Sequence, residues 1–342
     1  METSSTSSNS LAGFRERYHE LLVRFLWRQW SALGVAGHAS SADPWIIDPE
    51  ALLLFSTGVA RHDARLFDEI LDWLAVNGSW INLQRLANIH RDSDLGDSAI
   101  LSAMAAHLPR DSAVRKWAIR RNQDHPPVAD TVPQPLFHGV PVFGPMDEVF
   151  LKWGWQRGPV QLRGMSQRPL PYKPETFLFK LRALFGRQSR AEVIAWLLSH
   201  ESGHPAEVAR DTGYFPRSIQ VVLNELEFSG HVQVMKSGRE KRFALRQTEW
   251  LFLLTWSPPL PDPFPRWANW PAFFQYLWRV HGWLEQHDID HGSIPLLATE
   301  LRKAIDIASL AKTGLPARFV PRPITGEKFL KESLTELEAF LG

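Results

Sequence analysis

Histidines at two places in the chain could bind a metal ion. The string His200-Glu201-Ser202-Gly203-His204 matches the zinc-protease pattern, in which two histidines one helical turn apart hold the metal and the glutamate acts as base. Here Gly203 weakens a helix, and Pro205 disfavours helical dihedral angles at His204. We therefore do not expect these two histidines to share a helical face.

The second group of histidines lies between His281 and His291, where His287, Asp288 and Asp290 are close neighbours. Imidazole and carboxylate groups suit zinc or another divalent ion. A polar loop after a helix contains the same residues without any metal, so we predict no metal site here. A metal-dependent enzyme built on this segment is kept as a third hypothesis.

Other catalytic patterns are missing from the sequence. It has no glycine-rich phosphate loop and no nucleophile elbow. Because it has no cysteine, it can form neither a disulfide nor a thiolate nucleophile. We therefore expect a protein that is not an enzyme and that needs no cofactor.

The most specific pattern in the chain is a series of three short helices. The first is expected from Ser189 to Ser199, the second from Pro205 up to Gly213, and the third from Pro216 to Ser229. The apolar positions of the third helix are expected to form one buried face; they are Ile219, Val222, Leu223, Leu226 and Phe228. Short helices joined by a turn that contains glycine predict a helix-turn-helix.

A basic hairpin is expected to follow the three helices. Residues 231–235 alternate polar and apolar side chains, which indicates a strand, and residues 242–245 form the return strand. Between Lys236 and Arg246 there are five basic residues and one acidic residue. A positive hairpin beside a polar helix face is suited to phosphate contact, and it completes the element order of a winged helix-turn-helix.

Over residues 189–246 the chain resembles the winged helix-turn-helix transcription regulators of bacteria, closest to the ArsR-like and MarR-like groups. The matching features are the segment 205–209, the Gly213 turn, the segment 218–226 and the Gly230-His231-Val232 start of the hairpin with its Gly238-Arg239 tip. The metal sensing of ArsR-like proteins does not carry over, because this chain has no cysteine.

The resemblance implies which residues would contact DNA. In such families the third helix contacts base edges in the major groove, and the hairpin contacts the phosphate backbone. Carried over, the base contacts would come from Arg217, Ser218, Gln220 and Asn224, and the backbone contacts from Lys236, Arg239, Lys241 and Arg242. The third helix has one basic residue, Arg217, against Glu225 and Glu227, which is fewer than many DNA-contacting helices have.

The remaining sequence predicts a mainly α, multi-domain protein. The expected divisions are a disordered tail (1–10), a helical domain (11–124), a linker (125–147), the winged helix-turn-helix domain with an extended lead-in (148–248), and a tryptophan-rich helical domain (249–342). The helical pattern between Asp63 and Leu108 also outlines a second, degenerate helix-turn-helix. The tryptophan-rich part could pack as a core or line a site for a small-molecule effector or a protein partner.

Composition restricts the partners and the compartment. The net charge of +1 provides no global field for nucleic acid, so any attraction to DNA must be local. The longest apolar run, residues 250–256, is too short to cross a membrane, and from the hydroxyl-rich start, which lacks basic residues, we expect no signal peptide. We expect a cytoplasmic protein with no membrane partner.

Two functions follow from these patterns. The first is a sequence-specific DNA-binding transcription regulator, a repressor that occludes a promoter and binds double-stranded DNA as a homodimer. The second is a protein-interaction winged-helix factor, such as the partner or antitoxin of a toxin–antitoxin or defence system. The near-neutral charge and the acidic third helix favour the second function, whereas the basic hairpin favours the first.

Overall fold

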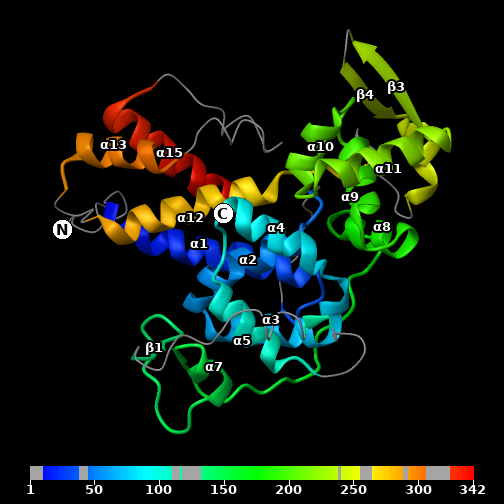
Figure 1. The fold of residues 1–342 in the computed structure, drawn as a ribbon. Helices are drawn as coiled ribbons and strands as arrows, with labels where there is room; N and C mark the ends of the chain where they lie inside the picture. The colour runs from blue at the N-terminus through cyan, green and yellow to red at the C-terminus, as the bar shows by residue number, and fades with distance from the viewer. Residues whose placement is uncertain are drawn as a thin grey trace, which may run out of the picture.

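The computed structural model describes residues 11–37, 45–109, 116–117, 132–237, 240–254, 264–287, 292–305 and 324–342. Within these ranges the chain is mainly helical, as predicted, with two small two-stranded sheets (Figure 1). The predicted tail at residues 1–10 lies outside the described residues. Of the helices described, none combines the length and the apolar composition needed to cross a bilayer.

The first half of the chain is a set of helices around α2. The elements are α1 (Leu11–Ala32), α2 (Pro49–Val59), η2 (Ala60–His62), α3 (Ala64–Asn77), η3 (Gly78–Trp80), α4 (Leu83–Ser93) and α5 (Ser98–His107). Side chains of Asp48, Asp63, Asn82 and Asp97 cap the starts of α2, α3, α4 and α5 by accepting backbone N–H bonds of 2.9–3.1 Å. Nearly every residue of α2 is buried, so this helix lies at the centre of the core.

The last three described helices complete that same core. They are α12 (Trp270–Gln286), α13 (Ile294–Ala304) and α15 (Gly326–Leu341), and α12 lies alongside α1 (Figure 1). The Phe55 and Phe274 rings stack with centroids 4.7 Å apart, and the Tyr18 hydroxyl donates to the Leu277 carbonyl at 2.8 Å. The prediction of a separate domain at 249–342 therefore fails for these helices, because the apolar side of α12 is covered by α1 and α2.

Tryptophans of α12 belong to this shared core. Trp270 and Trp283 are each 2% exposed, and the Trp270 indole donates to the Ile46 carbonyl at 2.6 Å. Core packing therefore accounts for these two rings. An effector site in the tryptophan-rich region stays a prediction.

A second hydrophobic core is formed by the central part of the chain. Its elements are η4 (Pro174–Thr176), α8 (Phe177–Phe185), α9 (Ser189–Leu198), α10 (Pro205–Thr212), α11 (Pro216–Phe228), β3 (Val232–Ser237), β4 (Glu240–Leu245) and η5 (Gln247–Leu253). The strands β3 and β4 pair antiparallel, from Val232 opposite Leu245 to Ser237 opposite Glu240. The three helices and the hairpin thus form at the residues where the sequence predicts them, within one residue at the helix ends.

The segment between the two helical groups is partly packed. It contains β1 (Gln134–Pro135), α7 (Glu148–Lys152) and β2 (Trp155–Gln156), and β1 pairs in parallel with β2. Leu136 is fully buried and Phe137 is 8% exposed, both within the first core. Within the predicted linker 125–147, Leu136 and Phe137 are therefore packed on the first core, whereas most other residues of 132–146 are exposed; residues 125–131 lie outside the described ranges.

Candidate nucleic-acid interface

Helix α11 presents the four residues that the resemblance assigns to base contact. Its other side buries Ile219, Val222, Leu223 and Leu226 in the second core. Arg217, Ser218 and Asn224 are exposed, and the half-buried Gln220 donates through Nε2 to the Asn224 Oδ1 at 2.8 Å. All four side chains therefore lie on or beside the solvent side of the helix, two near its start and two held as a pair.

Apolar and acidic side chains share this exposed face. Phe228 was predicted to be buried but is 95% exposed, because it follows Leu226 by two residues, about 200° around the helix. Val221 and Phe215 are each 50% exposed. Glu225 also lies on this side. The surface of α11 is therefore mixed and not simply cationic.

Two of the three described cations predicted for backbone contact form ion pairs within the molecule. Lys241 Nζ lies 3.1 Å from a Glu227 carboxylate oxygen, which ties the hairpin to α11. Arg242 donates to the Glu207 carboxylate and to the Ser202 carbonyl, each at 3.0 Å, and holds the return strand to the start of α10. Lys236 is exposed. Arg239 lies outside the described residues.

The turn between α10 and α11 packs against α4. Arg85 donates through Nε to the Thr212 carbonyl at 2.7 Å, and Asn88 donates to the Gly213 carbonyl at 3.2 Å. Gly213 has a φ of 75°, and an added Cβ would lie 3.1 Å from Ile89 Cγ1. Glycine is therefore required both by the backbone conformation and by the close approach of α4.

Buried ion pairs strengthen the same contact between the two cores. The Arg85 guanidinium binds Asp48 and Glu50, and the Arg182 guanidinium binds Glu50 and Glu192. Burial alone would raise the pKa of Asp48, but the charge and hydrogen bonds of Arg85 outweigh it and the pKa is lowered. Since α2 and α4 supply one part of this cluster and α8 and α9 the other, it fixes α11 relative to α4.

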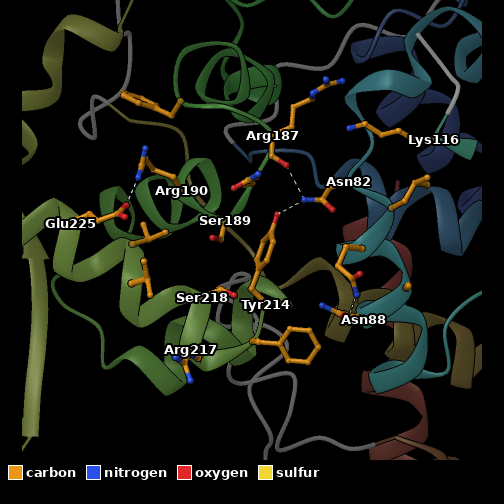
Figure 2. A pocket seen from close by; sticks show the side chains of 18 residues that line it. Asn82, Asn88, Lys116, Arg187, Ser189, Arg190, Tyr214, Arg217, Ser218 and Glu225 are labelled. Carbon is orange, nitrogen blue, oxygen red and sulfur yellow. Dashed lines mark hydrogen bonds and ion pairs between the residues drawn. The ribbon is translucent and has the colours of Figure 1, made fainter. Parts of the chain in front are cut away.

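A groove of about 1200 Å³ separates α4 from α11. Figure 2 shows Asn82 at its centre, donating to the Arg187 carbonyl at 2.8 Å and to the Tyr214 hydroxyl at 3.0 Å. Arg217 and Ser218 of α11 face the groove, and Asn88 of α4 lies opposite. The volume exceeds the roughly 300–1,000 Å³ of usual small-molecule pockets, so the groove has room for part of a larger ligand.

Positive charge predominates along this groove. Among the described residues, its lining contains Lys116, Arg187, Arg190 and Arg217 against one carboxylate, Glu225, which pairs with Arg190. Partial burial and the nearby Arg187 charge lower the pKa of Lys116. Figure 2 places Lys116 and Arg187 toward one end of the groove and Arg217 toward the other. An anionic ligand would therefore be attracted along its length.

The H-E-x-x-H string does not form a helical metal site. The His200 ring stacks on Trp196 with centroids 3.8 Å apart, and burial lowers its pKa. His204 instead caps α10, where its Nδ1 accepts from the Ala206 N–H at 3.2 Å. Between them Gly203 exchanges two backbone hydrogen bonds with Phe243 of β4, at 2.8 and 2.9 Å. The two histidines therefore serve packing and capping.

Sequence reasoning missed the α4 side of the groove. Asn82, Gln84 and Asn88 carry no local motif, and only the fold brings them opposite α11. Of the groove cations, Lys116 is recognisable in the sequence as part of a small basic run with Arg120 and Arg121. No family model, curated protein or solved structure was found to match the chain.

Proposed function

We propose that residues 189–246 are a winged helix-turn-helix that binds double-stranded DNA, and that the protein is a transcription regulator. The observation that carries the proposal is the position of Arg217, Ser218 and Asn224 on the exposed side of α11, beside a hairpin whose return strand also pairs with Gly203. Gly203 lies in the connection between α9 and α10, and its bridge to Phe243 joins this connection to β4 of the hairpin. This arrangement fixes the hairpin and α11 as one rigid surface.

On DNA, α11 would enter the major groove. Arg217 suits a guanine, and Gln220 or Asn224 suits an adenine once the bond between these two amides opens. Lys236 would contact a phosphate beside the major groove. Because Lys241 and Arg242 already bind carboxylates, the cations of the groove, Lys116 and Arg187, are added here as backbone contacts.

A homodimer is part of this proposal, because one module contacts few base pairs and two half-sites multiply specificity. Repression then needs no further chemistry, since a dimer bound across a promoter excludes other proteins. If residues 63–108 form a second helix-turn-helix, α4 is the helix of that motif that would contact DNA. Helix α4 lies directly across the groove from α11, so the two helices would face the same DNA.

The test is fluorescence anisotropy with DNA from upstream of the protein's own gene and a scrambled duplex, at two salt concentrations. We expect Arg217→Ala to reduce the preference for the upstream DNA, at a cost of about 1–3 kcal/mol on that duplex only. Lys236→Ala should weaken binding to both duplexes and lower the salt slope by about one. Lys331→Ala, which removes an exposed cation on α15, is the matched control and should change neither.

The alternative function, docking of a protein partner, is favoured by one observation. Phe228 is 95% exposed on α11, with Val221 half exposed on the same helix, and such side chains suit a protein surface better than a DNA groove. Phe228→Ser separates the two functions. Docking would be supported if the wild-type protein binds DNA weakly and without sequence preference and Phe228→Ser abolishes co-purification with the product of a neighbouring gene. The regulator would be supported if Phe228→Ser retains binding to the upstream DNA.

A further inference from the structure

Three histidines from distant parts of the chain meet where α1 and α12 lie alongside each other (Figure 1). They are His19 of α1, His62 of η2 and His281 of α12. One ring nitrogen from each lies within 4.8 Å of the others, and the His19 Nε2 is 3.1 Å from the His281 Nδ1. Spacing along the sequence groups His281 with His287 and His291 and not with His19 or His62. In the structure the His287 Nδ1 lies 2.9 Å from the Trp283 carbonyl, and His291 lies outside the described residues.

The surroundings leave ligand atoms of this cluster available. The His62 Nε2 is buried without a hydrogen-bond partner in the described part of the chain, which is costly for a polar atom unless something binds it. The His62 ring stacks on His19 and on His138, with centroids 4.4 and 4.3 Å apart. A carboxylate oxygen of Glu285 is 3.6 Å from the His19 Nε2.

Burial lowers the pKa of all four histidines in this cluster. Burial, together with the neighbouring histidines and Arg61, lowers the pKa of His62 to about 3 and that of His281 to about 4. Burial also lowers the pKa of His19 and His138. Because the His19 Nε2 and the His281 Nδ1 share a hydrogen bond, one of these nitrogens carries a proton, and that proton must leave or move to the other nitrogen of its ring before both can bind a metal.

We propose that His19, His62 and His281 bind one zinc ion, with Glu285 as the fourth ligand. Zinc takes four ligands in a tetrahedron with Zn–N distances of about 2.0–2.1 Å, which places its nitrogen ligands about 3.3 Å from one another. The His19 Nε2 and the His281 Nδ1 are 3.1 Å apart, close to this separation, and the hydrogen bond that they now share would be replaced by the two metal bonds. The most distant nitrogens of the set must approach by about 1.5 Å at most, which small rotations of the stacked rings supply.

The two arginines whose charge acts on these histidines, Arg61 and Arg15, both donate hydrogen bonds to backbone carbonyls. Arg61 precedes His62 in η2, but its Nε donates to the Leu136 carbonyl at 2.8 Å and its guanidinium lies over the Trp155 ring at 4.3 Å. Imidazole and carboxylate are ligands that suit zinc, and the chain has no cysteine to compete for it. An ion at this position would join α1, η2 and α12, and therefore the early and late parts of the first core.

Cobalt(II) titration of tag-free, chelator-treated protein tests the proposal, because tetrahedral cobalt reports its ligands through visible absorption. We expect one cobalt per chain, displaced by one zinc, and a zinc-dependent rise in melting temperature. His62→Ala should weaken binding by more than the roughly 10- to 100-fold that loss of an outer-shell partner costs. His231→Ala, which removes an exposed histidine of the hairpin region, should bind like the wild type.

Two results would overturn the proposal. One is wild-type protein that takes up no cobalt or zinc at micromolar concentration. The other is His62→Ala protein that binds the metal as tightly as the wild type. If His62→Ala does not fold, His19→Gln serves in its place, because the His19 side chain is 18% exposed and its replacement perturbs packing less.

Discussion

Glu50 is the residue whose removal tests most directly how the two cores are joined. Its side chain is fully buried and its carboxylate accepts four hydrogen bonds. Two come from Arg182 at 2.7 and 2.8 Å, one from Arg85 at 2.7 Å, and one from the Asn82 backbone N–H at 2.6 Å. Glu50→Ala leaves both guanidinium groups buried with one carboxylate fewer to bind.

The expected cost follows from that burial. Removing one partner of a buried ion pair costs about 3–5 kcal/mol, because the remaining charge stays desolvated. For a chain of this size about 2 °C is lost per kcal/mol, so the melting temperature should fall by about 6–10 °C. Far-ultraviolet circular dichroism measures the transition, because most described residues are helical.

A matched variant separates burial from pairing. Glu327 on α15 binds Lys331 with an N–O distance of 2.7 Å, the same as between Arg182 and Glu50, but its side chain is 55% exposed. Glu327→Ala should cost less than about 1 kcal/mol and lower the melting temperature by less than about 2 °C. Equal losses from the two substitutions would refute the reasoning, since the distance alone would then set the energy.

Two further predictions concern the backbone. The Asp72 carboxylate accepts N–H bonds from all four residues 163–166. Burial would raise the pKa of Asp72, but these hydrogen bonds outweigh burial and lower it. The contribution of Asp72 to the stability of the fold is therefore complete above the unfolded pKa of about 3.9 and is lost as pH falls through the folded pKa. Asp72→Asn should therefore lower the melting temperature at pH 7, and the difference from wild type should disappear in acid; a pH-independent difference would contradict the assignment. Both Gly213 and Gly230 have φ near 75°, so alanine at either position brings a backbone strain of about 1–2 kcal/mol. Only at Gly213 would the added Cβ also contact Ile89, so Gly213→Ala should lower the free energy of unfolding in urea by more than Gly230→Ala. Equal losses would exclude the close contact.

The sequence predicted local structure well. Asp48, Asp63 and Asp97 cap helices by accepting the N–H three residues ahead, and the prolines at the starts of α10 and α11 suit the first helical turn through their fixed φ. The same local arguments apply to the H-E-x-x-H string, where Gly203 and Pro205 exclude a helix that would carry both histidines on one face. Phe228 is the one residue of the predicted buried face of α11 that the structure exposes, because its position around the helix axis lies outside that face.

The candidate sites were predicted only in part, because they depend on contacts between distant segments. Arg217 and Asn224 could be placed on the exposed side of α11, but nothing in the sequence puts α4 across from them. The pairing of Lys241 and Arg242 with carboxylates is equally tertiary. The histidine cluster joins residues separated by up to 262 positions, and no periodicity or spacing links them.

The packing of α15 on α1 has a consequence for synthesis. Arg17 of α1 pairs with Glu338 of α15, 321 residues later. A ribosome that adds about 5–20 residues per second needs on the order of 15–60 s to join these two helices. During that time the part of α1 that α15 covers stays exposed, although α2 and η2 can already pack on α1, and the second core draws almost entirely on residues 177–267 and can close earlier. Translation order therefore lets the second core close before the first core is complete, and the surface of α1 that α15 covers is open to chaperones and proteases until the last segment of the chain is made.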